Sequence, residues 1–107
     1  MAKYLIKASY TAEGLKGVLK GGGTARASAI EGALKGLGGS LDALYFAFGD
    51  DDVYVIVDMP DQASAMAMAA TVGASGAISA YETVVLLEPA EVDAAMKIAV
   101  SYQPPGA

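Results

Sequence analysis

The sequence predicts an α+β domain built on one four-stranded antiparallel sheet, and two observations lead to this prediction. The first is the order of the apolar periodicities along the chain, which reads strand, helix, strand, strand, helix, strand. This is the split βαβ order of ferredoxin-like folds, in which right-handed crossovers place both helices on one face of the sheet. The second is that several strands are apolar on both faces, which indicates that both faces of the sheet are covered.

Each strand is predicted from alternation or from a short apolar run that turn residues bound. The strands are expected at residues 3–10, 40–48, 53–59 and 78–88. In the first strand Tyr4, Ile6 and Ala8 share one face, whereas Leu5 and Lys7 share the other. The second and third strands flank a run of aspartates and are expected to form a hairpin.

The helices are predicted from apolar residues at helical spacing and from their end signals. They are expected from Thr24 to about residue 37, from residue 62 to about residue 72, and over residues 89–100. Thr24 and Asp61 are the predicted N-caps, Gly38 follows the end of the first helix, and Pro89 opens the last one. Residues 12–20 contain too much glycine for more than a short helical turn.

Length and charge bound the classes of protein to which this chain can belong. Its 107 residues predict a single domain over residues 1–100, followed by a tail over residues 101–107. The net charge of −5 and the scattered Lys and Arg residues argue against binding to nucleic acid or to an anionic membrane surface. No apolar run approaches the length of a membrane span, so we expect a cytoplasmic protein.

Two residue types are missing from the chain, and each absence restricts its chemistry. Without Cys there are no disulfides, thiolate nucleophiles or iron–sulfur ligands, and without His the usual neutral-pH base and the commonest metal ligand are missing. Any reaction must use Tyr, Lys, Arg or carboxylates, or the chemistry of a substrate or bound group. We expect no cofactor.

The aspartate run Asp50-Asp51-Asp52 allows two interpretations, a metal site or a turn. Gly49 and the aspartates lie between two predicted strands, where Gly and Asp suit turn conformations and Asp side chains bond to nearby backbone N–H groups. A calcium loop needs several oxygens at set spacing and a distant bidentate Glu, which this run lacks. We therefore predict a turn and no metal.

The same stretch resembles the GYD-domain proteins, which are small bacterial and archaeal proteins of dimeric α/β-barrel type and mostly unknown function. The Gly-x-Tyr-Asp motif of that family falls on residues 49–52, where this chain keeps Gly49 and Asp52 and has Asp51 in place of tyrosine. "TAEG" after the first strand, "GG" after the first helix and "PD" after the third strand match as well. The resemblance covers about residues 3–88 and implies the fold and self-association, but no catalytic residue.

The glycine-rich stretch "KGGGTAR", residues 20–26, allows two interpretations of its own. Glycines before a helix N-terminus can present free N–H groups to an anion, with Lys20 and Arg26 close enough in sequence to assist. The spacing fits neither a Walker phosphate loop nor a dinucleotide fingerprint. We therefore expect a flexible loop, with an anion site as the alternative.

A second set of candidates lies on the sheet face away from the helices. Lys7, Tyr45 and Tyr54 fall in the middle of their strands, where they would border any space enclosed by a second sheet. A buried lysine must be paired or lose its charge, and Asp58 or Glu82 is the expected partner. The two interpretations are a satisfied ion pair and a small ligand pocket.

These observations favour a homo-oligomeric small-molecule-binding or assembly protein. The sheet face that the helices leave bare and the nearly all-apolar second helix both predict self-association, as a dimer or a higher oligomer. The alternatives are a cofactor-free enzyme of monooxygenase or isomerase type, by analogy of fold only, and a purely structural subunit.

Overall fold

The computed structural model describes residues 1–106, so the final position of the predicted tail, residue 107, lies outside it. In chain order the elements are β1 (Ala2–Tyr10), α1 (Ala12–Gly21), α2 (Gly23–Gly36), β2 (Ser40–Phe46), β3 (Val53–Met59), α3 (Gln62–Ala74), β4 (Ile78–Leu86) and α4 (Pro89–Met96).

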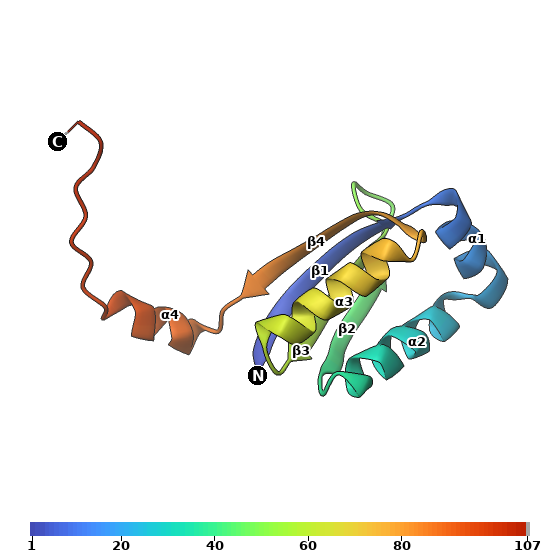
Figure 1. The fold of residues 1–107 in the computed structure, drawn as a ribbon, viewed down its shortest axis with the longest axis horizontal. Helices are drawn as coiled ribbons and strands as arrows, with labels where there is room; N and C mark the ends of the chain where they lie inside the picture. The colour runs from blue at the N-terminus through green and yellow to red at the C-terminus, as the bar shows by residue number, and fades with distance from the viewer. Residues whose placement is uncertain (107) are drawn as a thin grey trace.

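The four strands form one antiparallel sheet in the order β2-β3-β1-β4, with α2 and α3 on the same face (Figure 1). Helix α2 packs on β2 and α3 packs mainly on β4, the two edge strands. The predicted ferredoxin-like α+β fold is thereby confirmed, including the hairpin between β2 and β3.

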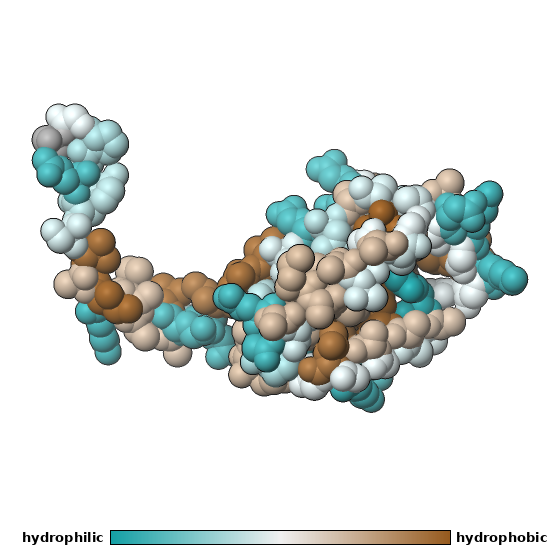
Figure 2. Space-filling view, in the orientation of Figure 1, coloured by the Kyte–Doolittle hydropathy of each residue, from teal (hydrophilic) through white to brown (hydrophobic). Residues whose placement is uncertain are grey.

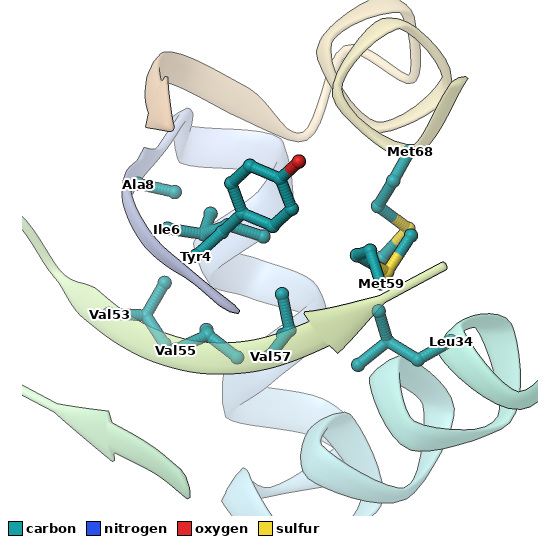
Figure 3. Packing of buried hydrophobic residues seen from close by; sticks show 9 residues of the cluster. All are labelled: Tyr4, Ile6, Ala8, Leu34, Val53, Val55, Val57, Met59 and Met68. Atoms are coloured by element: carbon teal, nitrogen blue, oxygen red, sulfur yellow. The ribbon is translucent and has the colours of Figure 1, made fainter. Parts of the chain in front are cut away.

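The core lies between the sheet and the helices, and the alternation of the central strands creates it. Tyr4, Ile6 and Ala8 of β1 are buried on the helix side, as are the odd-numbered residues of β3 from Val53 to Met59. Figure 3 shows Leu34 of α2 and Met68 of α3 extending toward these strand residues. The face assignment predicted for β1 is therefore confirmed.

The glycine-rich segment after β1 departs from the prediction. Residues 12–21 form the helix α1, which breaks for one residue at Gly22 and continues as α2 from Gly23. Gly22 has a φ of 84°, a conformation that favours glycine, and it is the N-cap of α2. The predictions of a flexible loop over residues 20–26 and of an N-cap at Thr24 were therefore wrong.

Tertiary packing explains why α1 forms despite its glycines. The Thr11 hydroxyl accepts from the Gly14 N–H at 3.1 Å and donates to the Gly76 carbonyl at 2.8 Å. A Cβ on Gly14 would lie 2.1 Å from the Ala77 carbonyl oxygen, so only glycine lets the helix approach this closely. The "TAEG" motif thus caps α1 and seats it against the segment before β4.

Most of the other predicted ends agree with the structure to within a few residues. Asp61 is the N-cap of α3 and accepts from the Ser64 N–H at 2.7 Å, as predicted. Gly38, with a φ of 80°, follows α2, and Pro89 opens α4. Strands β2 and β4 each end two residues early, and α4 ends at Met96 rather than at residue 100.

The chain after β4 projects from the body as a C-terminal arm, defined here as residues 87–106, which contains α4 (Figure 1). Every described residue of this arm is exposed. The radius of gyration, 16.9 Å, exceeds the about 13 Å typical of a compact domain of this length. Figure 2 shows hydrophobic atoms along much of the arm.

Candidate functional site

The sheet face away from the helices, called the open face here, holds the residues that the sequence singled out. Tyr45, Tyr54, Lys7 and Glu82 lie opposite one another across β2, β3, β1 and β4, and so form one continuous row. The Lys7 ammonium lies 3.4 Å from a Glu82 carboxylate oxygen. Lys7 is thus paired with one of its two predicted partners.

A second, charged row crosses the open face nearer the start of β1. Lys3 lies 3.1 Å from Asp58 and also contacts Asp42, which sits at the register shift in β2. The hydrogen bonds that Lys3 donates to Asp42 and Asp58 raise the pKa of Lys3, and the bond from Lys3 lowers the pKa of Asp42. The basic groups of the open face are therefore matched by acids of the same chain.

Between the two polar rows runs an apolar row formed by Ala43, Ile56, Leu5 and Val84, again one residue from each strand. These side chains are half-buried, and none of the helices within residues 1–106 covers them. The open face therefore has an apolar centre between two rows whose charges are already paired.

The aspartate run forms the turn between β2 and β3, as predicted, and its side chains bond to the end of β1. A carboxylate oxygen of Asp52 accepts from the Tyr10 N–H at 2.8 Å, and Asp51 accepts from the Ser9 hydroxyl at 3.1 Å. The Asp52 N–H donates to the Ala8 carbonyl at 2.9 Å. Of the motif residues, Asp52 thus fastens the hairpin to β1, whereas Gly49 is exposed at the turn.

The two residues proposed as an anion site, Lys20 and Arg26, have different surroundings. Lys20 is exposed in the last turn of α1. Arg26 is half-buried in α2, and its guanidinium carbon lies 6.0 Å from the centre of the Tyr10 ring, at the outer limit of a cation–π contact. Arg26 thus turns inward, whereas Lys20 faces solvent.

Arg26 lines a cavity of about 160 Å³, called the α2–α3 cavity here, that opens between these helices above the central strands. The cavity exists because α2 and α3 pack on opposite edges of the sheet and leave part of β1 and β3 without a helix directly above. Figure 2 shows the hollow between the two helices. Its walls are Ile6, Ala8, Tyr10, Arg26, Ala29, Ile30, Ala33, Leu34, Val53, Val55, Val57, Met68, Thr71, Val72, Ile78 and Tyr81.

Two residues of this wall each carry a buried polar atom without a partner. Within residues 1–106, neither the Tyr10 hydroxyl nor the Arg26 Nε has a hydrogen-bond partner, and neither atom has appreciable accessible surface. Leaving such a group unpaired costs about 1–3 kcal/mol. Both residues also line a second cavity of about 360 Å³ between α1 and α2, so they lie where the two cavities adjoin.

Tyr81 contributes a second phenol to the α2–α3 cavity. Burial raises the pKa of Tyr81 above its usual value of 10.0. The sequence indicates Arg26, together with Lys20, as a candidate anion-binding residue, and it does not single out Tyr10 or Tyr81. Tyr10 lies at an even-numbered position of β1, as Ile6 and Ala8 do, and alternate residues of a strand share a face. This alternation could have indicated that Tyr10 faces the helices.

The fold and these surfaces define the chain as a ferredoxin-like α+β protein with an uncovered sheet face. The model of the GYD domain matches residues 4–96, so the chain belongs to the GYD domain family. A comparison with curated proteins finds no match. No helix within residues 1–106 has the length and apolar character needed to cross a membrane.

Proposed function

We propose that this protein binds a small apolar molecule in the α2–α3 cavity and acts as a homo-oligomer. One observation carries the binding proposal: a cavity of about 160 Å³ in the helix-side core, walled almost wholly by apolar side chains. The cavity opens between α2 and α3, so a molecule can enter it from solvent. A bound apolar molecule would cover the apolar walls, and each Å² of apolar surface removed from water contributes about 25 cal/mol.

The volume of the cavity supports a ligand of the size of one aromatic ring. An engineered apolar core cavity of about 150 Å³ binds benzene, and this one is of similar volume. Its apolar lining with a few polar groups at one end is typical of small-molecule sites.

A thermal-stability titration of the full chain with toluene tests the binding proposal. A ligand that binds the folded state alone stabilises it by about 2.7 kcal/mol at one hundred times its dissociation constant. The matched control is Ala8→Leu, which extends a side chain of the cavity floor into the space. The melting temperature of the wild type should rise with toluene and that of the variant should not. An equal rise in the melting temperature of both proteins would show that toluene binds outside the α2–α3 cavity.

Two features support self-association with a second copy of this chain. The open face has an apolar row with no cover, flanked by charges that are already paired and so demand no oppositely charged partner. The C-terminal arm exposes six large apolar side chains: Leu87, Val92, Met96, Ile98, Val100 and Tyr102. A helix of eight residues such as α4 is marginal in water unless it packs on a surface. Facing sheets, with each arm laid over the other copy, would bury both surfaces.

Light scattering at micromolar concentration tests this assembly. The wild type should exceed 10.8 kDa, whereas Ile56→Lys, in the centre of the open face, should be monomeric. Met66→Lys is the matched control, because Met66 is 65% exposed on α3, outside both surfaces. A chain ending at Glu88 should associate more weakly than the full chain. A wild-type mass of 10.8 kDa would refute self-association.

A further inference from the structure

Two residues that line the α2–α3 cavity, Arg26 and Tyr10, indicate the chemical class of its ligand, because Arg26 has no ion pair within residues 1–106 and each residue has a polar atom without a partner. We infer that the ligand is an apolar carboxylate, with its hydrocarbon body in the cavity and its carboxylate bound by Arg26 and Tyr10. This inference rests on the proposed binding function and adds the charge of the ligand to it.

The hydrogen-bonding character of the two groups decides the sign of that charge. The Arg26 Nε is always a donor, and the guanidinium keeps its positive charge in proteins. The Tyr10 hydroxyl can donate to the same acceptor. A carboxylate offers two oxygens with about four acceptor positions, so it can take both bonds at once.

The surroundings of Arg26 leave its charge available to a ligand. Within the described part of the chain, no carboxylate lies within ion-pair distance of Arg26. Glu13 lines the neighbouring α1–α2 cavity, but it is exposed and lies 3.6 Å from Lys16. The guanidinium carbon of Arg26 lies 6.0 Å from the centre of the Tyr10 ring.

The position of the pair fixes the orientation of the ligand. Tyr10 ends β1 and Arg26 lies in the first turns of α2, so both belong to the end of the cavity that adjoins the α1–α2 cavity. The apolar side chains Val57 and Met68 line the α2–α3 cavity but not the second one. The carboxylate therefore points toward α1 and the hydrocarbon body toward the sheet.

Calorimetric titration of the full chain with benzoate, toluene and benzylamine tests the inference, because these ligands share a ring and differ in charge. Benzoate should bind at least about tenfold more tightly than toluene, as a charge-assisted hydrogen bond predicts. Benzylamine should bind most weakly. Arg26→Gln should remove the preference for benzoate and keep toluene binding, and Tyr10→Phe should reduce the preference several-fold. Lys20→Gln, which removes an exposed charge of α1, should change neither affinity.

The outcomes distinguish a failure of the carboxylate assignment from a failure of the proposed small-molecule binding in the α2–α3 cavity. If toluene binds and benzoate binds no more tightly, the carboxylate assignment is wrong and the apolar cavity site stands. If none of the three ligands binds, the proposed function fails and the inference fails with it. Should Arg26→Gln not fold by circular dichroism, an unchanged benzoate preference in Tyr10→Phe would overturn the role of the pair.

Discussion

Ala8→Leu is the substitution that most directly measures the space in the α2–α3 cavity. Ala8 is 3% exposed, lies in the central strand β1 and lines the cavity. Leucine adds three carbon groups, and each buried one is worth about 0.8 kcal/mol, or about 2.4 kcal/mol in all. Ordering the leucine side chain costs about 0.5–1 kcal/mol. We therefore expect a gain of about 1.5 kcal/mol in the free energy of unfolding.

Urea unfolding at matched protein concentration measures this gain, and thermal unfolding should show a rise of about 5–10 °C. The matched control is Ala67→Leu on α3, because Ala67 is exposed and lies outside the cavity wall, the open face and the C-terminal arm. It should change stability by no more than about 0.5 kcal/mol. If Ala8 were already closely packed, the leucine would overpack the core and cost about 1–3 kcal/mol. A loss of that size would refute the cavity.

Three further predictions concern contacts that hold the site together. Gly14→Ala should destabilise the chain by more than about 2 kcal/mol, because the added Cβ would meet the Ala77 carbonyl. Gly17 has open space around it, so Gly17→Ala should stabilise α1 by about 0.5–1 kcal/mol. Urea unfolding of the two variants measures both effects. Asp52→Ala removes the acceptor of a backbone N–H at the end of β1 and should cost about 1–2 kcal/mol in the same assay, while Asp52→Asn, which keeps an acceptor oxygen, should cost less. Tyr81 should ionise after the exposed tyrosines in an ultraviolet titration. Because the pKa of Tyr81 is raised in the folded state, the stability that its neutral form contributes is full below pH 10.0 and is lost as the pH rises through the folded pKa. If Tyr81→Phe still showed a tyrosine that ionises after the exposed ones, the assignment to Tyr81 would be contradicted.

The sheet was predictable because its signal is local. Alternation in β1 assigned Tyr4 and Ile6 to the helix side, and the cap at Asp61 was visible as one polar residue before an apolar run. The helix α1 was not predictable from propensity, since the glycines that weaken a helix alone are what let Gly14 approach Ala77 in the folded chain.

The cavity was beyond sequence reasoning for a different reason. The helical spacing of Ile30 and Leu34 is visible in the sequence, and in the structure both side chains pack in or against the core. The spacing carries no information about how far α2 stands from α3, and that separation creates the space. The sequence shows that Arg26 lies close to a run of glycines. The direction in which its side chain points depends on where α2 begins, and α2 begins after the single-residue break at Gly22.

The bond between Asp52 and the backbone of Tyr10 has a consequence for how the wall of the α2–α3 cavity can change in evolution. The hairpin turn holds the strand end from which the Tyr10 side chain reaches the cavity wall. A change of turn length or sequence near Asp52 would therefore move Tyr10 without altering any residue that lines the cavity. Substitutions are well tolerated in exposed loops. Selection on the turn could therefore change the shape of the interior cavity although the turn does not line it.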